Sequence, residues 1–124
     1  MSRKSISIVF IIQLIIIFIL FSSCATTTKI GQPITRQLKD GVYEGNYTGG
    51  PNKAFVKVTI ENNKIIEIQI LEHWALKGKK ADLIIPGRIL ENQRTDVDVV
   101  SGATNSSIVI MNAVQRAVEK AYQN

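Results

Sequence analysis

The chain has 124 residues, a formal net charge of +5 and 45% hydrophobic residues, which suits one domain with a modest core. It contains one cysteine and one histidine, so an intramolecular disulfide is excluded and a zinc site built from these residue types is not expected. The positive charge is mild, and no arginine-rich stripe with interleaved aromatic residues is present, which argues against nucleic acid binding.

The first 23 residues predict an export signal. Arg3 and Lys4 supply a positively charged start, and Ile8–Phe21 is then apolar except at Gln13. This run is shorter than the roughly 20 residues of a spanning helix, which favours a cleaved leader over a permanent anchor. Cys24 follows a Phe-Ser-Ser sequence that resembles a bacterial lipobox. The resemblance implies that the thiol is lipidated, and several acyl chains would hold the protein stably at a membrane. The alternatives are an ordinary leader or an uncleaved anchor, with an incidental thiol.

Residues 24–39 are interpreted as a tether and residues 40–124 as the domain. Ala25–Leu38 has a threonine run, a glycine, a proline and little apolar periodicity, which is typical of a linker. A first strand with a weak signal is the alternative. Loss of the two basic residues of the leader leaves 15 − 2 = 13 basic and 10 acidic residues, so the mature charge is 13 − 10 = +3.

A three-stranded antiparallel meander is predicted at the start of the domain. Gly41–Tyr47 and Ala54–Ile60 alternate in side-chain character and are separated by a turn cluster that contains two glycines and a proline. Two asparagines, which tolerate positive φ, then predict a second turn. In the third strand, Ile66, Ile68 and Ile70 are expected to share the buried face.

The segment after the meander is less regular. Glu72–Lys80 breaks the alternation and is expected to be a loop. Ala81–Gln93 contains helical pieces that should be interrupted at Pro86-Gly87, because proline breaks a helix. Asp96–Val100 predicts a short strand with Val97 and Val99 inward.

The last segment gives the clearest pattern. Its apolar residues recur at the spacing of an amphipathic helix of about four turns. They are Ile110, Ala113, Val114, Ala117, Val118 and Ala121. Thr104, Asn105 and Ser106 are candidate N-cap residues. We therefore expect an α+β fold, in which helices pack on a small antiparallel sheet made of the meander plus the short strand.

Ser101–Thr104 lies between the short strand and the last helix. Gly102 allows unusual backbone angles, Ala103 adds no bulk, and Ser101 and Thr104 offer hydroxyls. The first turn of a helix presents unpaired N–H groups and the positive end of its dipole, so this turn could bind an anion. A capped turn without a ligand is the alternative. A serine hydrolase is disfavoured, because His73 is the only histidine and no G-x-S-x-G is present.

The flavinylation motif D-x-x-[ST]-G-A-T of the FMN-binding domain family resembles Asp98-Val99-Val100-Ser101-Gly102-Ala103-Thr104. The family includes subunits of the sodium-translocating NADH:quinone reductase and of the Rnf electron-transfer complex, and small exported flavoproteins. Its opening D-G-x-Y-x-G resembles Asp40–Gly45, and the similarity covers nearly the whole mature domain. The resemblance implies that Thr104 is joined to the FMN phosphate by a phosphoester bond, made by a separate flavin transferase with FAD as donor and with magnesium.

Further residues receive supporting roles. Asp98 is expected to serve the transferase reaction or to orient the turn, because a carboxylate repels a phosphate unless a cation lies between them. Trp74 could stack on the flavin ring, and His73 or a nearby lysine could favour the anionic reduced flavin. Trp74 could instead be a core residue. The lysines of the predicted loop could instead form a solvated face, or one that meets acidic partners or lipid headgroups.

The resemblance thus implies a lipid-anchored flavoprotein on the extracytoplasmic side of a bacterial membrane. It would carry covalent FMN between an electron donor and an acceptor in or near that membrane, as a carrier rather than a catalyst on its own. Two alternatives stay open. One is a binding or structural lipoprotein without redox activity, and the other is an accessory redox-sensing domain of an exported reductase.

Overall fold

The computed structural model describes residues 8–15, 31–75 and 77–123. Residues 8–15, within the predicted leader, are helical and exposed. Within the described ranges, no helix combines the length and the apolar character that a membrane crossing requires. Cys24 and residues 25–30 of the predicted tether lie outside the described residues, so lipidation stays a prediction.

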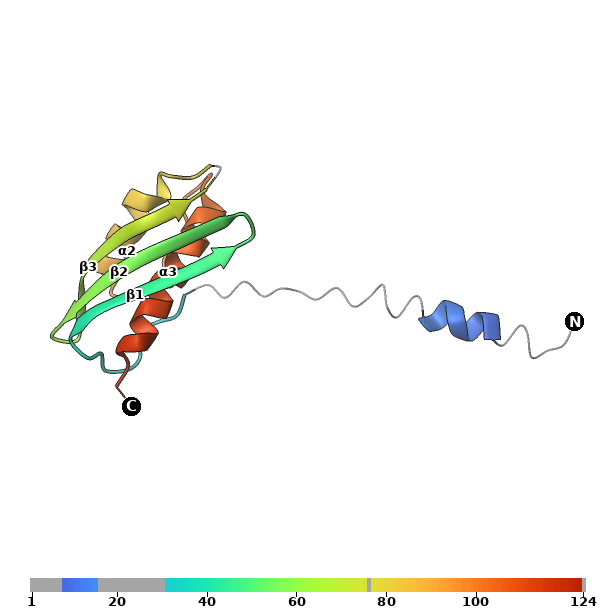
Figure 1. Cartoon of the computed structure of the whole chain (residues 1–124), viewed down its shortest axis with the longest axis horizontal. Helices are drawn as coiled ribbons and strands as arrows, with labels where there is room; N and C mark the ends of the chain where they lie inside the picture. The colour runs from blue at the N-terminus through green and yellow to red at the C-terminus, as the bar shows by residue number, and fades with distance from the viewer. Residues whose placement is uncertain (1–7, 16–30, 76, 124) are drawn as a thin grey trace, which may run out of the picture.

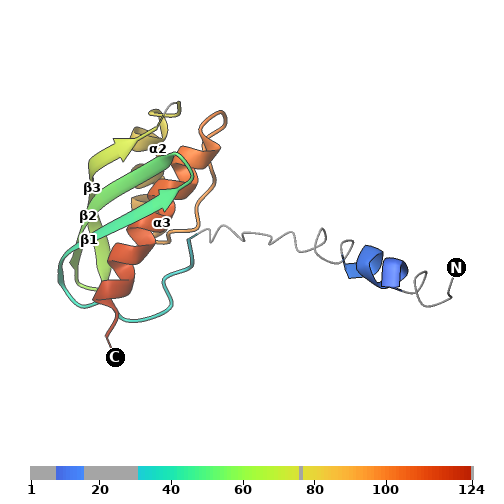
Figure 2. The same cartoon turned by 45° about the vertical axis from the view of Figure 1, so that its right-hand side comes forward.

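Three strands and two helices form the domain (Figure 1). Strands β1 (Gly41–Gly49), β2 (Asn52–Glu61) and β3 (Lys64–Trp74) pair antiparallel in the order β1-β2-β3. Helices α2 (Ala81–Asn92) and α3 (Thr104–Ala121) cover one face of this sheet, and the other face is left uncovered (Figure 2). Helix α3 contacts β1 and β2, and α2 contacts β3. The predicted α+β fold, the meander and the C-terminal helix are confirmed.

The core lies between the sheet and α3. Alternate residues of β2 are fully buried on the helix side, as the period of a half-buried strand predicts. They are Ala54, Val56, Val58 and Ile60. The alanines of α3 let the helix approach β1 very closely. A Cβ placed on Gly45 would lie 2.0 Å from the carbonyl oxygen of Ala113, so only glycine fits at this crossing.

Strand β3 differs from the prediction at Ile66. Ile60 pairs with Ile65 and Thr59 pairs with Glu67, so Ile66 is the extra residue of a β-bulge. Ile65 is therefore 2% exposed and Ile66 is 48% exposed, and the prediction that Ile66 faces the core is wrong. The strand also continues through Trp74, so the first residues of the predicted loop belong to the sheet.

Helix α2 is continuous through Pro86, so the predicted interruption is wrong. A proline inside a helix removes one hydrogen bond, here the one that would reach the carbonyl of Asp82. Pro86 is buried together with Ile85 and Ile89, and this packing offsets the loss.

Asp96–Val100 is not a strand, which corrects another expectation. Side chains hold its backbone in place of a neighbouring strand. Nη1 of Arg88 donates to the carbonyl oxygens of Asp98 (2.7 Å) and Val99 (3.2 Å). Val97 packs partly against the core, as predicted, but Val99 is 39% exposed.

Residues 31–39 pack on the domain. The backbone N–H of Gln32 donates to Oγ1 of the buried Thr95 at 2.8 Å. Leu38 is a core residue and forms an isolated β-bridge with Tyr122. Packing therefore begins within the segment that was interpreted as a tether.

Candidate functional site

The turn Ser101–Thr104 leads directly into α3. The backbone N–H of Ala103 donates to the carbonyl of Val100 at 2.9 Å, and Gly102 has a φ of +76°, a conformation that favours glycine. Thr104 is the first residue of the helix, and its side chain is exposed. The N-cap is Ala103, without a side-chain cap, rather than one of the three polar residues suggested by the sequence. The start of α3 therefore presents N–H groups that no side chain caps.

A buried serine that the sequence did not single out fixes this turn. Oγ of Ser107 donates to the carbonyl of Ala103 at 2.7 Å and accepts from the N–H of Val100 at 2.9 Å. Ser107 is fully buried and Ala103 is 4% exposed, whereas Ser101 and Thr104 face solvent. Ser107 thus holds the turn on its buried side, and Ser101 and Thr104 lie on its solvent side.

The loop between β3 and α2 lies against this turn. Oγ of Ser106 donates to the carbonyl of Lys77 at 3.1 Å. Gly78 has a φ of +103°, and a Cβ there would lie 2.8 Å from Oγ of Ser106. From the same loop, Nζ of Lys80 lies 3.2 Å from the position of a Cβ on Gly102. The lysine-rich loop and the predicted flavinylation turn therefore share one surface.

A pocket of about 300 Å³ opens at this surface. It is lined by Pro51, Asn52, Lys77, Gly102, Ala103, Asn105 and Ser106. The lining includes a lysine and the first residues of α3, but no carboxylate and no aromatic side chain. Such a pocket suits an anionic, polar group.

His73 lies beneath the surface and does not line this pocket. Its side chain is 1% exposed, because it pairs with Ala54 on the helix-covered face of the sheet. Nδ1 of His73 contacts Oδ1 of Asp82, in the first turn of α2. Nε2 is buried without a hydrogen-bond partner among the described residues.

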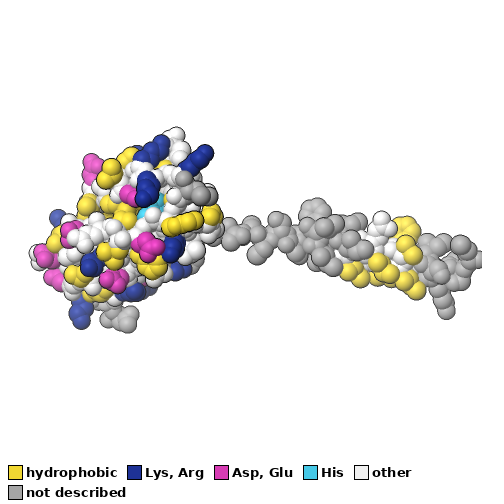
Figure 3. Space-filling model, turned by 45° about the horizontal axis from the view of Figure 1, so that its top comes forward, with side chains coloured by type: hydrophobic (Ala, Val, Ile, Leu, Met, Phe, Trp, Pro, Cys, Tyr) yellow, Lys and Arg dark blue, Asp and Glu magenta, His cyan; other side chains and the backbone are white. Residues whose placement is uncertain are grey.

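Trp74 points to the opposite side of the sheet from His73, since successive strand residues alternate. It is 55% exposed, so it is not a core residue. Phe55 and Leu71 are also exposed on β2 and β3. Figure 3, which brings the top of the domain forward, shows hydrophobic side chains interspersed with basic and acidic ones. Trp74 does not line the pocket beside Thr104.

Asp98 is exposed, and its carboxylate has no hydrogen bond or ion pair in the part of the chain that the structure describes. It lines a separate depression of about 370 Å³ with Arg88, Arg94 and Asp96 among others. Nη1 of Arg88 bonds the backbone carbonyl of Asp98, whereas no described residue bonds its carboxylate, so its expected role in the turn stays a prediction.

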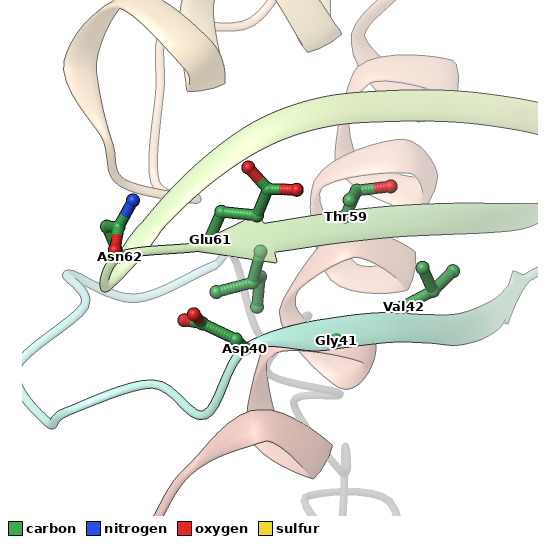
Figure 4. A pocket seen from close by; sticks show the side chains of 7 residues that line it. Asp40, Gly41, Val42, Thr59, Glu61 and Asn62 are labelled. Carbon is green, nitrogen blue, oxygen red and sulfur yellow. The ribbon is translucent and has the colours of Figure 1, made fainter.

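Another pocket lies at the far end of the sheet from Thr104. It has a volume of about 430 Å³ and lies between the start of β1 and the end of β2, with Asp40, Glu61 and Asn62 at its rim (Figure 4). Across the described ranges, no group of three histidine, cysteine or acidic residues is placed to hold a metal ion. The pocket beside Thr104, which has a lysine and the N-terminus of α3 in its lining, is the candidate site for an anionic group.

Comparisons with known proteins identify the family of the domain. A family model described as "FMN-binding domain" matches residues 48–119, a range that contains β2, β3, α2 and all but the last two residues of α3, Thr104 included. An uncharacterized protein of Treponema pallidum (strain Nichols) is 35% identical over an alignment of 103 residues that covers 77% of this chain and 27% of that protein. The NADH:acrylate oxidoreductase of Vibrio harveyi is 32% identical over an alignment of 95 residues that covers 75% of this chain and 10% of that protein.

The chain thus spans about a quarter and a tenth of the length of these two relatives. The similarity therefore concerns only part of each relative. From the extent of the family match, the chain belongs to the FMN-binding domain family.

Proposed function

We propose that this protein carries FMN covalently on Thr104 and transfers electrons at the extracytoplasmic side of a bacterial membrane, to which a lipid on Cys24 anchors it. One observation carries the proposal. In a domain of the FMN-binding family, Thr104 presents an exposed hydroxyl at the uncapped N-terminus of α3, at the end of a D-x-x-S-G-A-T sequence.

The residues around Thr104 fit the phosphate of the cofactor. The first turn of α3 supplies N–H groups and the positive end of the helix dipole. The ammonium group of Lys80 lies beside Gly102, and Lys77 lines the adjoining pocket. A phosphodiester keeps one negative charge, which these groups would stabilise, and no carboxylate lines the pocket to repel it.

The proposed attachment is a phosphoryl transfer from FAD. Oγ of Thr104 forms a bond to the flavin-side phosphorus, the bond to the bridging oxygen of the diphosphate breaks, AMP leaves and the hydroxyl proton is released. A separate flavin transferase with magnesium would catalyse this step. The carboxylate of Asp98 is exposed and free, so it is available to the transferase or its metal.

Electron transfer follows from the chemistry of the cofactor, because FMN supplies one-electron and two-electron chemistry when bound. The ester would prevent loss of the flavin outside the cytoplasm. The lipid would keep it near electron donors and acceptors at the membrane. The relative named NADH:acrylate oxidoreductase contains a similar domain, which supports a redox role.

That relative also favours a second candidate function. Its matched region is a tenth of a longer reductase, so this chain could serve as the accessory redox domain of an exported reductase. Affinity purification of the full-length chain from membranes would separate the two. Stoichiometric recovery of one reductase supports the accessory role, and flavin-loaded protein without such a partner supports a general carrier.

The test of covalent loading uses denaturing gels. The full-length chain is expressed with a flavin transferase, and flavin fluorescence is recorded after denaturation for wild type, Thr104→Ala and Thr48→Ala. Thr48 is the matched control because it is an exposed threonine on β1, outside the motif and the pocket. We expect fluorescence in wild type and Thr48→Ala and none in Thr104→Ala.

An unlabelled wild-type band, beside a positive control that shows an active transferase, would overturn the carrier proposal. A lipoprotein without redox activity would then be the better interpretation. The anchor has its own test, in which labelled fatty acid should be incorporated into wild type but not into Cys24→Ser.

A further inference from the structure

We infer that the pocket beside Thr104 holds the phosphate and ribityl arm of the flavin without help from the ester, and that Asn52 is the positioning residue for this arm. The inference rests on the proposed function, because it takes the ligand to be a flavin. It adds that the chain itself recognises the cofactor, through residues outside the D-x-x-S-G-A-T sequence.

The first observation concerns Asn52. It is the first residue of β2, it is 6% exposed, and it lies in the buried row that continues with Ala54. Its carboxamide has no hydrogen bond to any residue that the structure describes, yet it lines the pocket. Two side-chain atoms are both inaccessible to solvent and without a hydrogen bond, and they belong to His73 and Asn112. Asn52 is not one of these residues, so we infer that its amide is still accessible from the pocket. Because a polar group at a buried position is nearly always hydrogen-bonded, this amide bonds to whatever fills the pocket, which is water in the free protein and a ligand hydroxyl in the proposed complex.

The second observation concerns charge. Lys77 lines the pocket, and Nζ of Lys80 lies 3.2 Å from the Cβ position of Gly102, which lines it too. Neither lysine forms an ion pair with a described residue. The two lysines of the loop before α2 and the positive end of the α3 dipole therefore lie at the same pocket, although the two segments are distant in sequence.

The composition of the lining identifies the part of the flavin that enters. The pocket has no aromatic side chain, so it offers no stacking surface for the ring. The ester would fix the phosphate at Thr104, and the next group along the cofactor is the ribityl chain. Its hydroxyls donate and accept hydrogen bonds, which matches a carboxamide that also does both. We therefore assign the phosphate to the lysines and the α3 N-terminus, and the ribityl hydroxyls to Asn52.

The test uses full-length Thr104→Ala in detergent, which cannot form the ester at this position. FMN and riboflavin are titrated separately, and binding is followed by flavin fluorescence anisotropy. On this background, Asn52→Ala should weaken both ligands by about tenfold, because both contain the ribityl chain. Lys77→Gln and Lys80→Gln should weaken FMN but not riboflavin, which lacks the phosphate. Asn46→Ala and Lys57→Gln, on the uncovered face of the sheet, are matched controls that should change neither affinity.

Asn52 is buried, so each variant is first checked by thermal melting. If Asn52→Ala does not fold, Asn52→Asp keeps the shape and places a carboxylate at the pocket, and it should weaken FMN more than riboflavin. Unchanged affinities in a folded Asn52 variant would overturn the inference, as would Thr104→Ala that binds no flavin.

The two proposals can fail separately. If wild type is flavinylated but Thr104→Ala binds no flavin, the covalent carrier stands and recognition by the chain is refuted. If Thr104→Ala binds FMN in the predicted way but wild type is never flavinylated, the pocket stands and the ester is refuted.

Discussion

Gly45→Ala should destabilise the domain severely, because α3 crosses β1 in direct contact at this residue. The new Cβ would lie 2.0 Å from the carbonyl oxygen of Ala113 and 2.7 Å from the backbone nitrogen of Ala117. An ordinary contact begins at 3.4 Å, so α3 would have to retreat by 3.4 − 2.0 = 1.4 Å. Both atoms belong to the helix backbone, so no rotamer change relieves the clash.

The expected loss follows from this geometry. Overpacking of a core typically lowers the free energy of unfolding by about 1–3 kcal/mol, and a clash with backbone belongs at the upper end. Replacement of glycine also lowers the conformational entropy of the unfolded chain, which raises the free energy of unfolding by about 0.4–1 kcal/mol. We expect a net loss of about 2 kcal/mol, which lowers the melting temperature by about 8–16 °C in a domain of this size.

The matched control is Gly87→Ala in α2. No atom lies within 4 Å of a Cβ at Gly87, so the substitution meets open space inside a helix. It should raise the free energy of unfolding by about 0.5–1 kcal/mol, because alanine favours the helix. Thermal melts followed by circular dichroism compare both variants with wild type. If Gly45→Ala melts at the wild-type temperature, the close approach of α3 to β1 is refuted.

Three further predictions concern single side chains. Gln93→Ala should lower the free energy of unfolding in urea by about 1–3 kcal/mol, because the Gln93 carboxamide bonds the N–H and the carbonyl of Ile65, each at 2.8 Å. An unchanged urea midpoint would contradict this role. The side-chain hydrogen bond from Arg94 holds the pKa of Asp96 below its usual range, and Arg94→Gln should raise that pKa in an NMR titration. Since the folded-state pKa is depressed, the pair stabilises the fold above the unfolded-state pKa and ceases to do so as pH falls through the folded-state pKa. The effect on stability should be small because the pair is exposed, and an Asp96 pKa that Arg94→Gln does not move would refute the contact. Asp98→Ala should leave the melting temperature unchanged, since its carboxylate contacts no described residue, but should reduce flavinylation, and full loading would exclude a role for the carboxylate.

The elements with a regular period could be predicted from the sequence. Alternation marks β2, and helical spacing marks α3, because each element presents one face to the same core. The face of β3 at Ile66 could not be predicted, since the bulge inserts one residue and reverses the alternation. Gln93, far along the chain, holds the backbone of Ile65 beside this bulge, so the decisive contact is not local.

At Asp96–Val100 the sequence predicted a strand that the structure does not contain. Its alternating sequence has the pattern of a strand, but no described strand pairs with it, and Arg88 and Ser107 bind its backbone. A pattern of side chains does not show whether a hydrogen-bonding neighbour exists. Pro86 likewise predicts a break in α2 that burial of its ring outweighs.

The candidate site, too, could be predicted only in part from the sequence. The turn before Thr104 is a local feature, so its place at the start of a helix could be predicted. Asn52 and Lys80 lie far from that turn in sequence, and only the packing of the loops brings them to the same surface. The burial of His73 and the exposure of Trp74 depend on the continuation of β3, which the irregular sequence after Leu71 did not predict.

The claim that Thr104 carries FMN is tested most directly by peptide mass spectrometry. Trypsin cleavage after Arg94 and Arg116 releases Thr95–Arg116, which contains the whole turn. From chain expressed with an active flavin transferase, we expect this peptide to gain the mass of FMN less one water, with fragment ions that place the gain on Thr104 and not on the fully buried Thr95. An unmodified peptide, or a gain on Ser101, would contradict the account.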